Sequence, residues 1–236
     1  MGAGYEDFTI ILPTLNEGRT MDRMLDYLTR NYAGARIIVS DDGSVDGTRE
    51  TVRRFASGKR NVTLLDRSLK GAVRGLTASV LDGIELSNTK FVIVIDADMQ
   101  HPPGRIREIA RRLEEGSELV VATRAKVTDW DFHRKVISRS LMYIGRLALF
   151  ARGKETCGDI FSGFFGVKRE LFLDVLGKNR KRFVKEGYKV LFDFLKCVDS
   201  GTLRISEVPF VFRTRKFGLS KAGFRQGIAI MKSFAT

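Results

Sequence analysis

Two acidic side chains and an amide follow one apolar segment in the middle of the chain. Residues 91–95 are apolar and largely β-branched, which is typical of a strand buried on both faces of a parallel sheet. Asp96, Asp98 and Gln100 then occupy alternate positions, and Pro102 or Pro103 begins a helix. Ligands of open α/β sheets bind beyond the carboxyl ends of the strands, and these oxygen donors suit a Mg²⁺ or Mn²⁺ ion that also binds phosphate. The pattern predicts a divalent-metal site, and an acidic turn that caps the next helix is the alternative.

Two earlier strand ends carry similar polar groups. Thr14 and Glu17 follow the apolar residues 8–12, and Asp41 and Asp42 follow residues 36–40. We expect these groups to face the same crevice as the predicted metal site, because the carboxyl ends of parallel strands share one edge of a sheet. The glycines that follow the aspartates allow a ligand to approach the backbone closely. Together the segments predict a nucleotide held through its base and ribose, with its phosphates on the metal, although each Asp-Gly segment alone is also typical of an ordinary turn.

The segments that position these groups alternate between apolar strands and sequences of helical periodicity. We expect strands at residues 8–12, 36–40, 61–65, 91–95, 118–122 and 203–212, and helices at residues 19–31, 48–55, 70–86, 133–152, 188–198 and 221–234. This alternation predicts right-handed βαβ crossovers and an α/β fold with a mostly parallel, doubly wound sheet. Residues 159–167 are aromatic and glycine-rich, and no element is predicted there.

Charge is unevenly distributed along the chain, which carries a formal net charge of +13. Residues 1–120 contain 17 Lys and Arg against 18 Asp and Glu, whereas residues 121–236 contain 24 against 10. A one-sided basic half indicates an anionic partner, either nucleic acid or an anionic membrane surface. The basic amphipathic segments 133–152 and 221–234 favour a membrane interface, and packing of both helices against the sheet is the alternative.

Several classes of protein are disfavoured by what the sequence lacks. It contains no GxxxxGK[ST] motif and no GxGxxG after the first strand, which argues against a P-loop kinase and a dinucleotide dehydrogenase. Cys157 and Cys197 have no metal-site spacing, so we expect reduced thiols. The first eight residues have no apolar signal segment, and no apolar run approaches the roughly 20 residues of a transmembrane helix.

Four motifs follow one another along the chain: residues 13–17 (PTLNE), 41–48 (DDGSVDGT), 70–75 (KGAVRG) and 96–103 (DADMQHPP). They resemble the successive motifs of family 2 inverting glycosyltransferases with the GT-A fold. Later motifs make the chain most similar to dolichyl-phosphate mannose synthases and related polyprenyl-phosphate hexosyltransferases: residues 122–124, 130–138, 159–164, 186–189, 207–209 and 215–221. The resemblance spans about residues 8–221. Leu15 stands where an aromatic residue is common, and the glycine loop departs from the usual Gly-Leu-Gly.

The resemblance also implies roles for individual residues. The nucleotide sugar would be bound by Pro13, Thr14, Glu17, Asp41, Asp42, Lys70, Asp96 and Ala97. Mn²⁺ or Mg²⁺ would be held by Asp98 and Gln100, with Asp96 close by. The phosphate of a lipid acceptor would be bound by Arg124, Arg134, Ser138, Arg215 and Lys221. Asp96, Asp98 and Arg124 are the predicted catalytic residues.

The predicted reaction transfers mannose from GDP-mannose to dolichyl or polyprenyl phosphate with inversion, at the cytoplasmic face of a membrane. A lipid monophosphate is already an anionic nucleophile near neutral pH, so no general base is required, and neither His101 nor His133 has a catalytic context in the sequence. We expect a catalytic domain at residues 1–220, with a nucleotide-sugar half at 1–122 and an acceptor half at 123–220, and an interface helix at 221–236. The alternatives are a UDP-glucose donor, a basic nucleic-acid-binding protein without a recognised motif, and a non-catalytic membrane adaptor.

Overall fold

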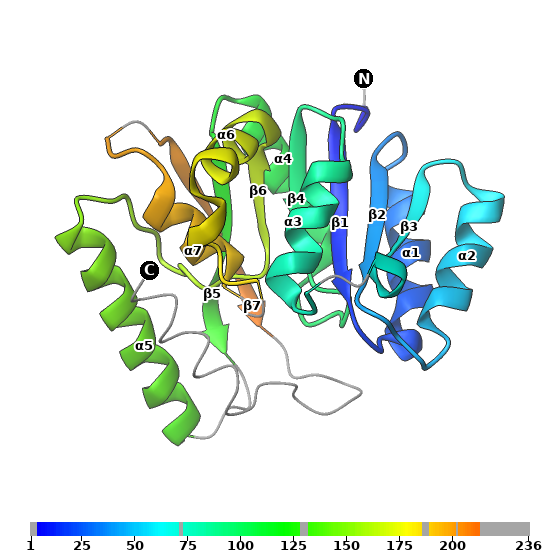
Figure 1. Cartoon of the computed structure of the whole chain (residues 1–236), viewed down its shortest axis with the longest axis horizontal. Helices are drawn as coiled ribbons and strands as arrows, with labels where there is room; N and C mark the ends of the chain where they lie inside the picture. Colours follow the sequence, from blue (N-terminus) through cyan, green and yellow to red (C-terminus); the bar gives the residue numbers. More distant parts are fainter. Residues whose placement is uncertain (1–3, 71–72, 128–131, 186–188, 202, 213–236) are drawn as a thin grey trace.

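Seven strands form one sheet in the order β3-β2-β1-β4-β6-β5-β7 (Figure 1). The computed structural model describes residues 4–70, 73–127, 132–185, 189–201 and 203–212. The strands are β1 (Phe8–Thr14), β2 (Arg36–Asp41), β3 (Val62–Asp66), β4 (Phe91–Val94), β5 (Leu119–Val127), β6 (Phe165–Lys168) and β7 (Ile205–Phe212). The six predicted strands are therefore confirmed, and β6 lies in the segment for which no element was predicted.

Among these seven strands, β6 alone runs against the others. β1 pairs in parallel with β2 and β4, β2 with β3, and β5 with β7, whereas β6 is antiparallel to both β4 and β5. Six strands therefore end at the same edge of the sheet, and β6 begins there. This topology confirms the predicted mostly parallel sheet and brings the segment before Phe165 to the edge where the polar strand ends meet.

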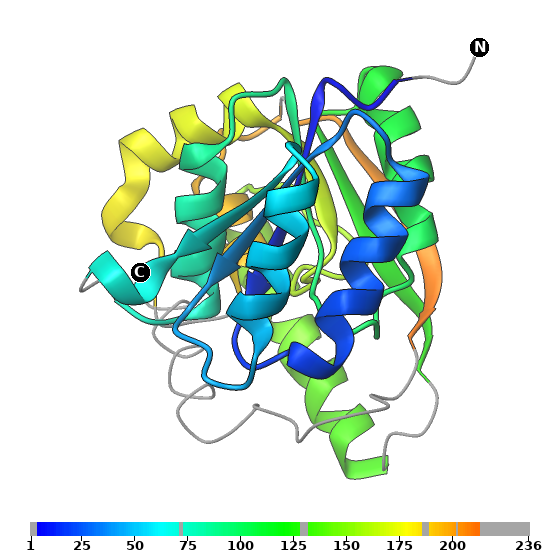
Figure 2. The ribbon, with the colours of Figure 1, turned by 90° about the vertical axis from the view of Figure 1, so that its right-hand side faces the viewer.

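Helices cover both faces of the sheet, as the view along it shows (Figure 2). They are α1 (Gly18–Asn31), α2 (Thr48–Gly58), α3 (Leu76–Leu86), α4 (Ile106–Glu114), α5 (Phe132–Ala151), α6 (Arg169–Asn179) and α7 (Val190–Cys197). Short 3₁₀ turns lie at Arg67–Lys70, Pro103–Arg105 and Arg180–Arg182. The predicted helix at 70–86 therefore begins later, at Leu76, and the helix after the prolines begins with a 3₁₀ turn.

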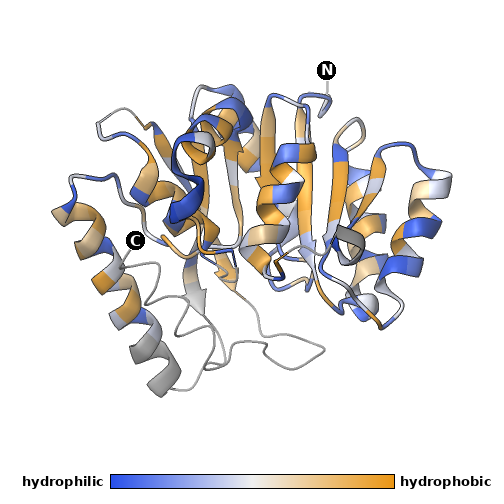
Figure 3. Ribbon diagram, viewed as in Figure 1, coloured by the Kyte–Doolittle hydropathy of each residue, from blue (hydrophilic) through white to orange (hydrophobic). Residues whose placement is uncertain are grey.

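Alternating strand side chains divide the core into two layers. Ile10 and Leu12 pack with α1, α2 and α4 on one face, while Ile11 packs with α3, α6 and α7 on the other. The central strands are accordingly mostly apolar in Figure 3, as expected for strands covered on both faces. None of the described helices is both long enough and apolar enough to span a bilayer.

Candidate active site

The turns after β1 and β2 are joined by side-chain hydrogen bonds. Ser44 Oγ accepts the Asn16 N–H at 2.7 Å, and Asn16 Oδ1 accepts the Val45 N–H at 2.9 Å. Thr48 Oγ1 accepts the Glu17 N–H at 3.0 Å. Asn16 has a φ of 51°, which is uncommon for a residue with a side chain, and its two hydrogen bonds hold it there. The first two strand ends therefore form one hydrogen-bonded rim at the sheet edge where the sequence predicts that they meet.

Asp46 fastens the start of α1 to this rim. Its Oδ2 accepts the Gly18 N–H at 3.0 Å, and its Oδ1 accepts the Thr48 N–H at 3.2 Å. Burial alone would raise the pKa of Asp46, but the Thr48 hydroxyl and these N–H groups outweigh burial and lower the pKa. Asp46 is therefore an ionised structural anchor of the rim.

Asp41 and Asp42 perform different tasks although they are neighbours. Asp41 is fully buried, and its Oδ1 accepts the N–H groups of Gly43 at 3.0 Å and Ser44 at 2.8 Å, so it shapes the turn. Asp42 is 7% exposed and forms an ion pair with the buried Arg67. Burial outweighs this cation and raises the pKa of Asp42. Both were predicted to bind the nucleotide; Asp41 is placed where it would act through the turn.

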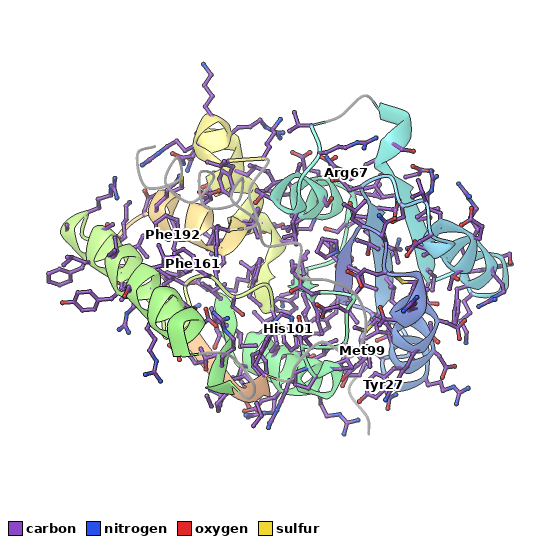
Figure 4. The ribbon with its side chains drawn as sticks, turned by 90° about the horizontal axis from the view of Figure 1, so that it is seen from below. Tyr27, Arg67, Met99, His101, Phe161 and Phe192 are labelled. Carbon is purple, nitrogen blue, oxygen red and sulfur yellow. The ribbon has the colours of Figure 1, made fainter. Side chains whose placement is uncertain are left out.

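Arg67 was missed by the sequence reasoning and is a central residue of the site. Besides Asp42, it donates to Asp82 Oδ2 at 2.8 Å and to the Val73 carbonyl at 2.7 Å. The N–H of Gly75 in turn donates to Asp42 Oδ2 at 2.8 Å. Arg67 therefore ties the glycine loop before α3 to the end of β2, and Figure 4 shows it beside α3 at this edge. A single arginine after a predicted strand carries no periodic signal that could have identified it.

The two aspartates after β4 adopt separate positions. Asp98 is 8% exposed, and its Oδ1 accepts the Gln100 N–H at 2.9 Å. Met99, between Asp98 and Gln100, has a φ of 62°, a left-handed backbone conformation that is rare for a residue with a side chain of this size. Asp96 is more open and lies against Gly163, where a Cβ would come within 2.8 Å of Asp96 Oδ2. The strained turn therefore presents two carboxylates and an amide at the end of β4.

These donors fit a hard divalent cation. Carboxylate and amide oxygens are the ligands expected for Mg²⁺ or Mn²⁺ that shares its coordination with phosphate. The predicted set consists of two carboxylates and Gln100, and the described part of the chain contains no group of three or more His, Cys, Asp or Glu side chains suited to a metal. The structure supports the chemistry of the predicted donor set, and metal binding stays a prediction.

His101 contacts Asp96, which the sequence gave no reason to expect. Its Nδ1 lies 3.2 Å from Asp96 Oδ2, and the ring is 5% exposed. It packs among Phe164, Phe210 and Phe212, with ring centroids 5.4–5.7 Å away. The aromatic packing fixes the imidazole beside Asp96, and within the described residues its Nδ1 forms no hydrogen bond. In Figure 4 it lies near the middle of this edge, close to Met99.

Arg124, at the same edge on β5, is held by Asp159 from the segment before β6. Its Nε lies 2.6 Å from Asp159 Oδ2 and its Nη2 lies 3.0 Å from Oδ1, which is a bidentate ion pair. Asp159 is 2% exposed, and the guanidinium also lies 5.7 Å from the Phe212 ring centroid. Asp159 was not among the predicted site residues, because only the reversed strand β6 brings its segment to this edge.

The other predicted residues fall into three groups. Pro13, Thr14 and Ala97 are buried in or beside the strand ends, where Thr14 accepts the Asp42 N–H at 2.9 Å through its carbonyl. Arg134 and Ser138 both lie on α5, four residues apart and therefore on one helix face. The side chains of Lys70 and Arg134 lie outside the described part of the structure. Arg215, Lys221 and the predicted helix at 221–236 lie outside the described residues altogether.

The sequence of the chain matches a known family over most of its length. The model of glycosyl transferase family 2 matches residues 9–176. The chain belongs to glycosyl transferase family 2. This membership confirms the predicted family and, at that level, the prediction of a glycosyltransferase.

Two curated relatives share the name dolichol-phosphate mannosyltransferase. The chain is 30% identical to dolichol-phosphate mannosyltransferase of Pyrococcus furiosus, covering 90% of this chain and 58% of that protein. It is 27% identical to dolichol-phosphate mannosyltransferase of Saccharomyces cerevisiae, covering 91% of this chain and 80% of that protein. The chain thus spans less than two thirds of the length of the archaeal relative.

Solved structures of other sugar transferases share the fold. Glucosyl-3-phosphoglycerate synthase from Mycobacterium tuberculosis, in complex with Mn²⁺, UDP and glucosyl-3-phosphoglycerate, has a TM-score of 0.63 and 20% identity, covering 97% of this chain and 77% of that chain. Mannosyl-3-phosphoglycerate synthase from Rubrobacter xylanophilus has a TM-score of 0.63 and 18% identity, covering 97% and 72%. These likenesses confirm the predicted GT-A fold.

Proposed function

We propose that this protein transfers a hexose to dolichyl phosphate or another polyprenyl phosphate, and that the hexose is mannose from GDP-mannose. The observation that carries the proposal is the edge where β1, β2, β4 and β5 end together, because it has carboxylates at the end of β4 and an arginine at the end of β5. The two named relatives above act as dolichol-phosphate mannosyltransferases, which supports the same chemistry here.

The donor would bind over β1, β2 and β4. The rim built by Asn16 and Ser44 is rigid, and Asp42 is kept in place by Arg67, so the nucleoside would meet a preorganised surface. Bound at Asp98 and Gln100, with Asp96 close by, Mn²⁺ or Mg²⁺ would stabilise the charge that develops on the leaving nucleoside diphosphate.

The acceptor would bind on the β5 side, where Arg124 is oriented by Asp159. Arg134, Ser138, Arg215 and Lys221 complete the proposed phosphate contacts. A guanidinium held by a buried carboxylate is well suited to phosphate, because its remaining N–H groups stay aimed in one direction. The phosphate itself is the nucleophile, so the chain needs only to align it with the anomeric carbon, and in-line attack inverts configuration.

A membrane surface would bring the acceptor to this side. We propose that α5 lies at the cytoplasmic interface, because its outer face combines exposed apolar and basic side chains. We define that outer face by Tyr143, Ile144, Leu147 and Phe150, flanked by Arg139, Arg146 and Arg152. Both cysteines are buried free thiols, which fits a reducing compartment.

The proposal is tested by a transfer assay with purified protein. GDP-mannose and UDP-glucose, each radiolabelled in the sugar, are offered with a polyprenyl phosphate in Mn²⁺ or in EDTA. We expect label in the lipid fraction from GDP-mannose with Mn²⁺ and at least a hundredfold less with EDTA. Label from UDP-glucose alone would reassign the donor. No transfer of either sugar, together with tight salt-sensitive binding of DNA, would replace the enzyme proposal with the nucleic-acid alternative.

A further inference from the structure

Lys189 contacts Phe161, in the segment that also carries Asp159, and has no role in the proposal above. It is the residue that precedes α7, and its ammonium nitrogen lies 4.1 Å from the ring centroid of Phe161. That ring is 8% exposed and packs against Phe192 with a centroid distance of 5.4 Å. Figure 4 shows both rings on the part of this edge that faces α5. The ammonium is therefore positioned by an aromatic surface, through a cation–π contact.

The charged groups that act on Lys189 come from three elements of the site. They are Arg124 on β5, Asp159 before β6 and Asp96 after β4. Burial, followed by the positive charge of Arg124, lowers the pKa of Lys189 to about 7, while the two carboxylates act in the opposite direction. Asp159 already makes a bidentate pair with Arg124, and Asp96 contacts His101. A further anion beside Lys189 would favour its charged form and so offset the effects of burial and of Arg124.

A phosphate monoester is an anion of suitable charge. Near neutral pH it carries about −1.5 to −2, more than one guanidinium neutralises. A nucleoside diphosphate would instead meet the carboxylates at the end of β4, on the far side of Asp96 from Arg124.

We propose that Lys189 binds the phosphate of the acceptor together with Arg124, as a second cation of the acceptor site. This inference rests on the proposed function and adds a residue to it. Lys189 would contact the phosphate and not the sugar donor. Its neutralisation should therefore weaken use of the acceptor while leaving use of the donor almost unchanged.

Lys168 provides a matched control. It is also a lysine that directly precedes a helix, α6, and it forms an ion pair with Glu118 at 3.3 Å. β6 begins at the site edge and ends at Lys168, so this lysine lies at the opposite end of the sheet. The variants are K189M, K189R and K168M, with K189Q as a second neutral variant, and each is first shown to unfold cooperatively on heating.

The experiment measures binding of farnesyl phosphate by calorimetry, and KM for farnesyl phosphate and for the sugar donor. For K189M and K189Q we expect Kd and KM for farnesyl phosphate to rise roughly ten- to hundredfold, the usual effect of losing a charged hydrogen bond. KM for the donor should change less than twofold, K189R should recover most of the affinity, and K168M should match the wild type.

The outcomes separate this inference from the proposed function. If the wild type binds and uses farnesyl phosphate while K189M and K189Q do so equally well, the inference is wrong and the function stands. A rise confined to the donor KM would also overturn it. If the wild type neither binds farnesyl phosphate nor transfers sugar to it, the function and the inference fail together.

Discussion

Among single residues, the aspartates at the strand ends differ in their tasks because their surroundings differ. Asp41 and Asp46 accept backbone N–H groups and hold turns, whereas Asp42 and Asp159 each pair with an arginine. Asp96 is partly exposed and lies against His101 and Gly163. The task of each aspartate is thus decided by the groups that contact it, and most of these groups lie outside the motif that contains the aspartate.

Gly163 tests whether the placement of Asp96 matters for the reaction. A Cβ on Gly163 would lie 2.8 Å from Asp96 Oδ2, so we expect G163A to displace that carboxylate and lower kcat at least tenfold. Stability should fall by only about 1 kcal/mol, because the carboxylate is partly exposed and can move. The comparison is G177A, since a Cβ at this helical glycine meets nothing within 4 Å and alanine favours a helix.

Steady-state kinetics and thermal unfolding of both variants decide the matter. G177A should keep the kcat of the wild type and unfold at the same or a slightly higher temperature. If G163A were as active as G177A, the position of Asp96 against Gly163 would have no part in the reaction.

Which site residues can be predicted from sequence depends on whether their signal is local. Asp96, Asp98 and Gln100 follow an apolar strand directly, so their position at the sheet edge could be inferred from order along the chain alone. Arg67 and His101 could not be inferred in this way. Arg67 pairs with Asp42 from the end of another strand, and His101 packs against Phe210 of β7. Composition and periodicity do not record such long-range contacts.

At the level of the elements, β6 determines how the acceptor side is built. Because it runs against β4 and β5, its first residue lies at the edge where the other strands end. The preceding loop therefore delivers Asp159 to Arg124 and Gly163 to Asp96. A parallel strand in this place would have brought the loop after it, not before it, to the site.

The six strands other than β6 could be predicted from the sequence, whereas β6 could not. Those strands are apolar runs, and their right-handed crossovers fix the order of neighbours. β6 has only four residues and contains Gly166, where a Cβ would lie 2.5 Å from Ile109 Cγ2. Close packing of α4 thus requires glycine where a β-branched residue would have signalled a strand. Its pairing is also antiparallel and long-range, which no local pattern records.

The outer face of α5 predicts binding to anionic membranes. Tyr143, Leu147 and Phe150 are 71%, 55% and 76% exposed, and they follow helical spacing. Each large apolar side chain that enters a membrane contributes roughly 1.5–3 kcal/mol. We therefore expect the double variant L147D/F150D to bind phosphatidylglycerol vesicles at least tenfold more weakly in a sedimentation assay.

The control for this experiment is another exposed leucine at a helix. Leu86 at the end of α3 is 49% exposed, and α3 lies apart from α5 in Figure 1. L86D should bind vesicles like the wild type. Equal vesicle binding by L147D/F150D would show that α5 does not meet the membrane.

Viewed as a whole, the molecule joins two halves of different charge along one edge of one sheet. Residues 1–120 are almost neutral, while residues 121–236 carry the positive excess. β4 belongs to the first half and β5 to the second, with β6 between them. We propose that the nucleotide lies on the neutral half and the lipid phosphate on the basic half, so that Asp96 and Asp98 mark the boundary at which the sugar is transferred.

The most direct test of this arrangement is an anomalous diffraction map from crystals grown with Mn²⁺ and GDP. We predict one strong manganese peak at the end of β4, bonded to the Asp98 carboxylate and to diphosphate oxygens, with the guanosine over the ends of β1 and β2. A diphosphate bound away from β4, or GDP bound there with no manganese at Asp98, would contradict the account.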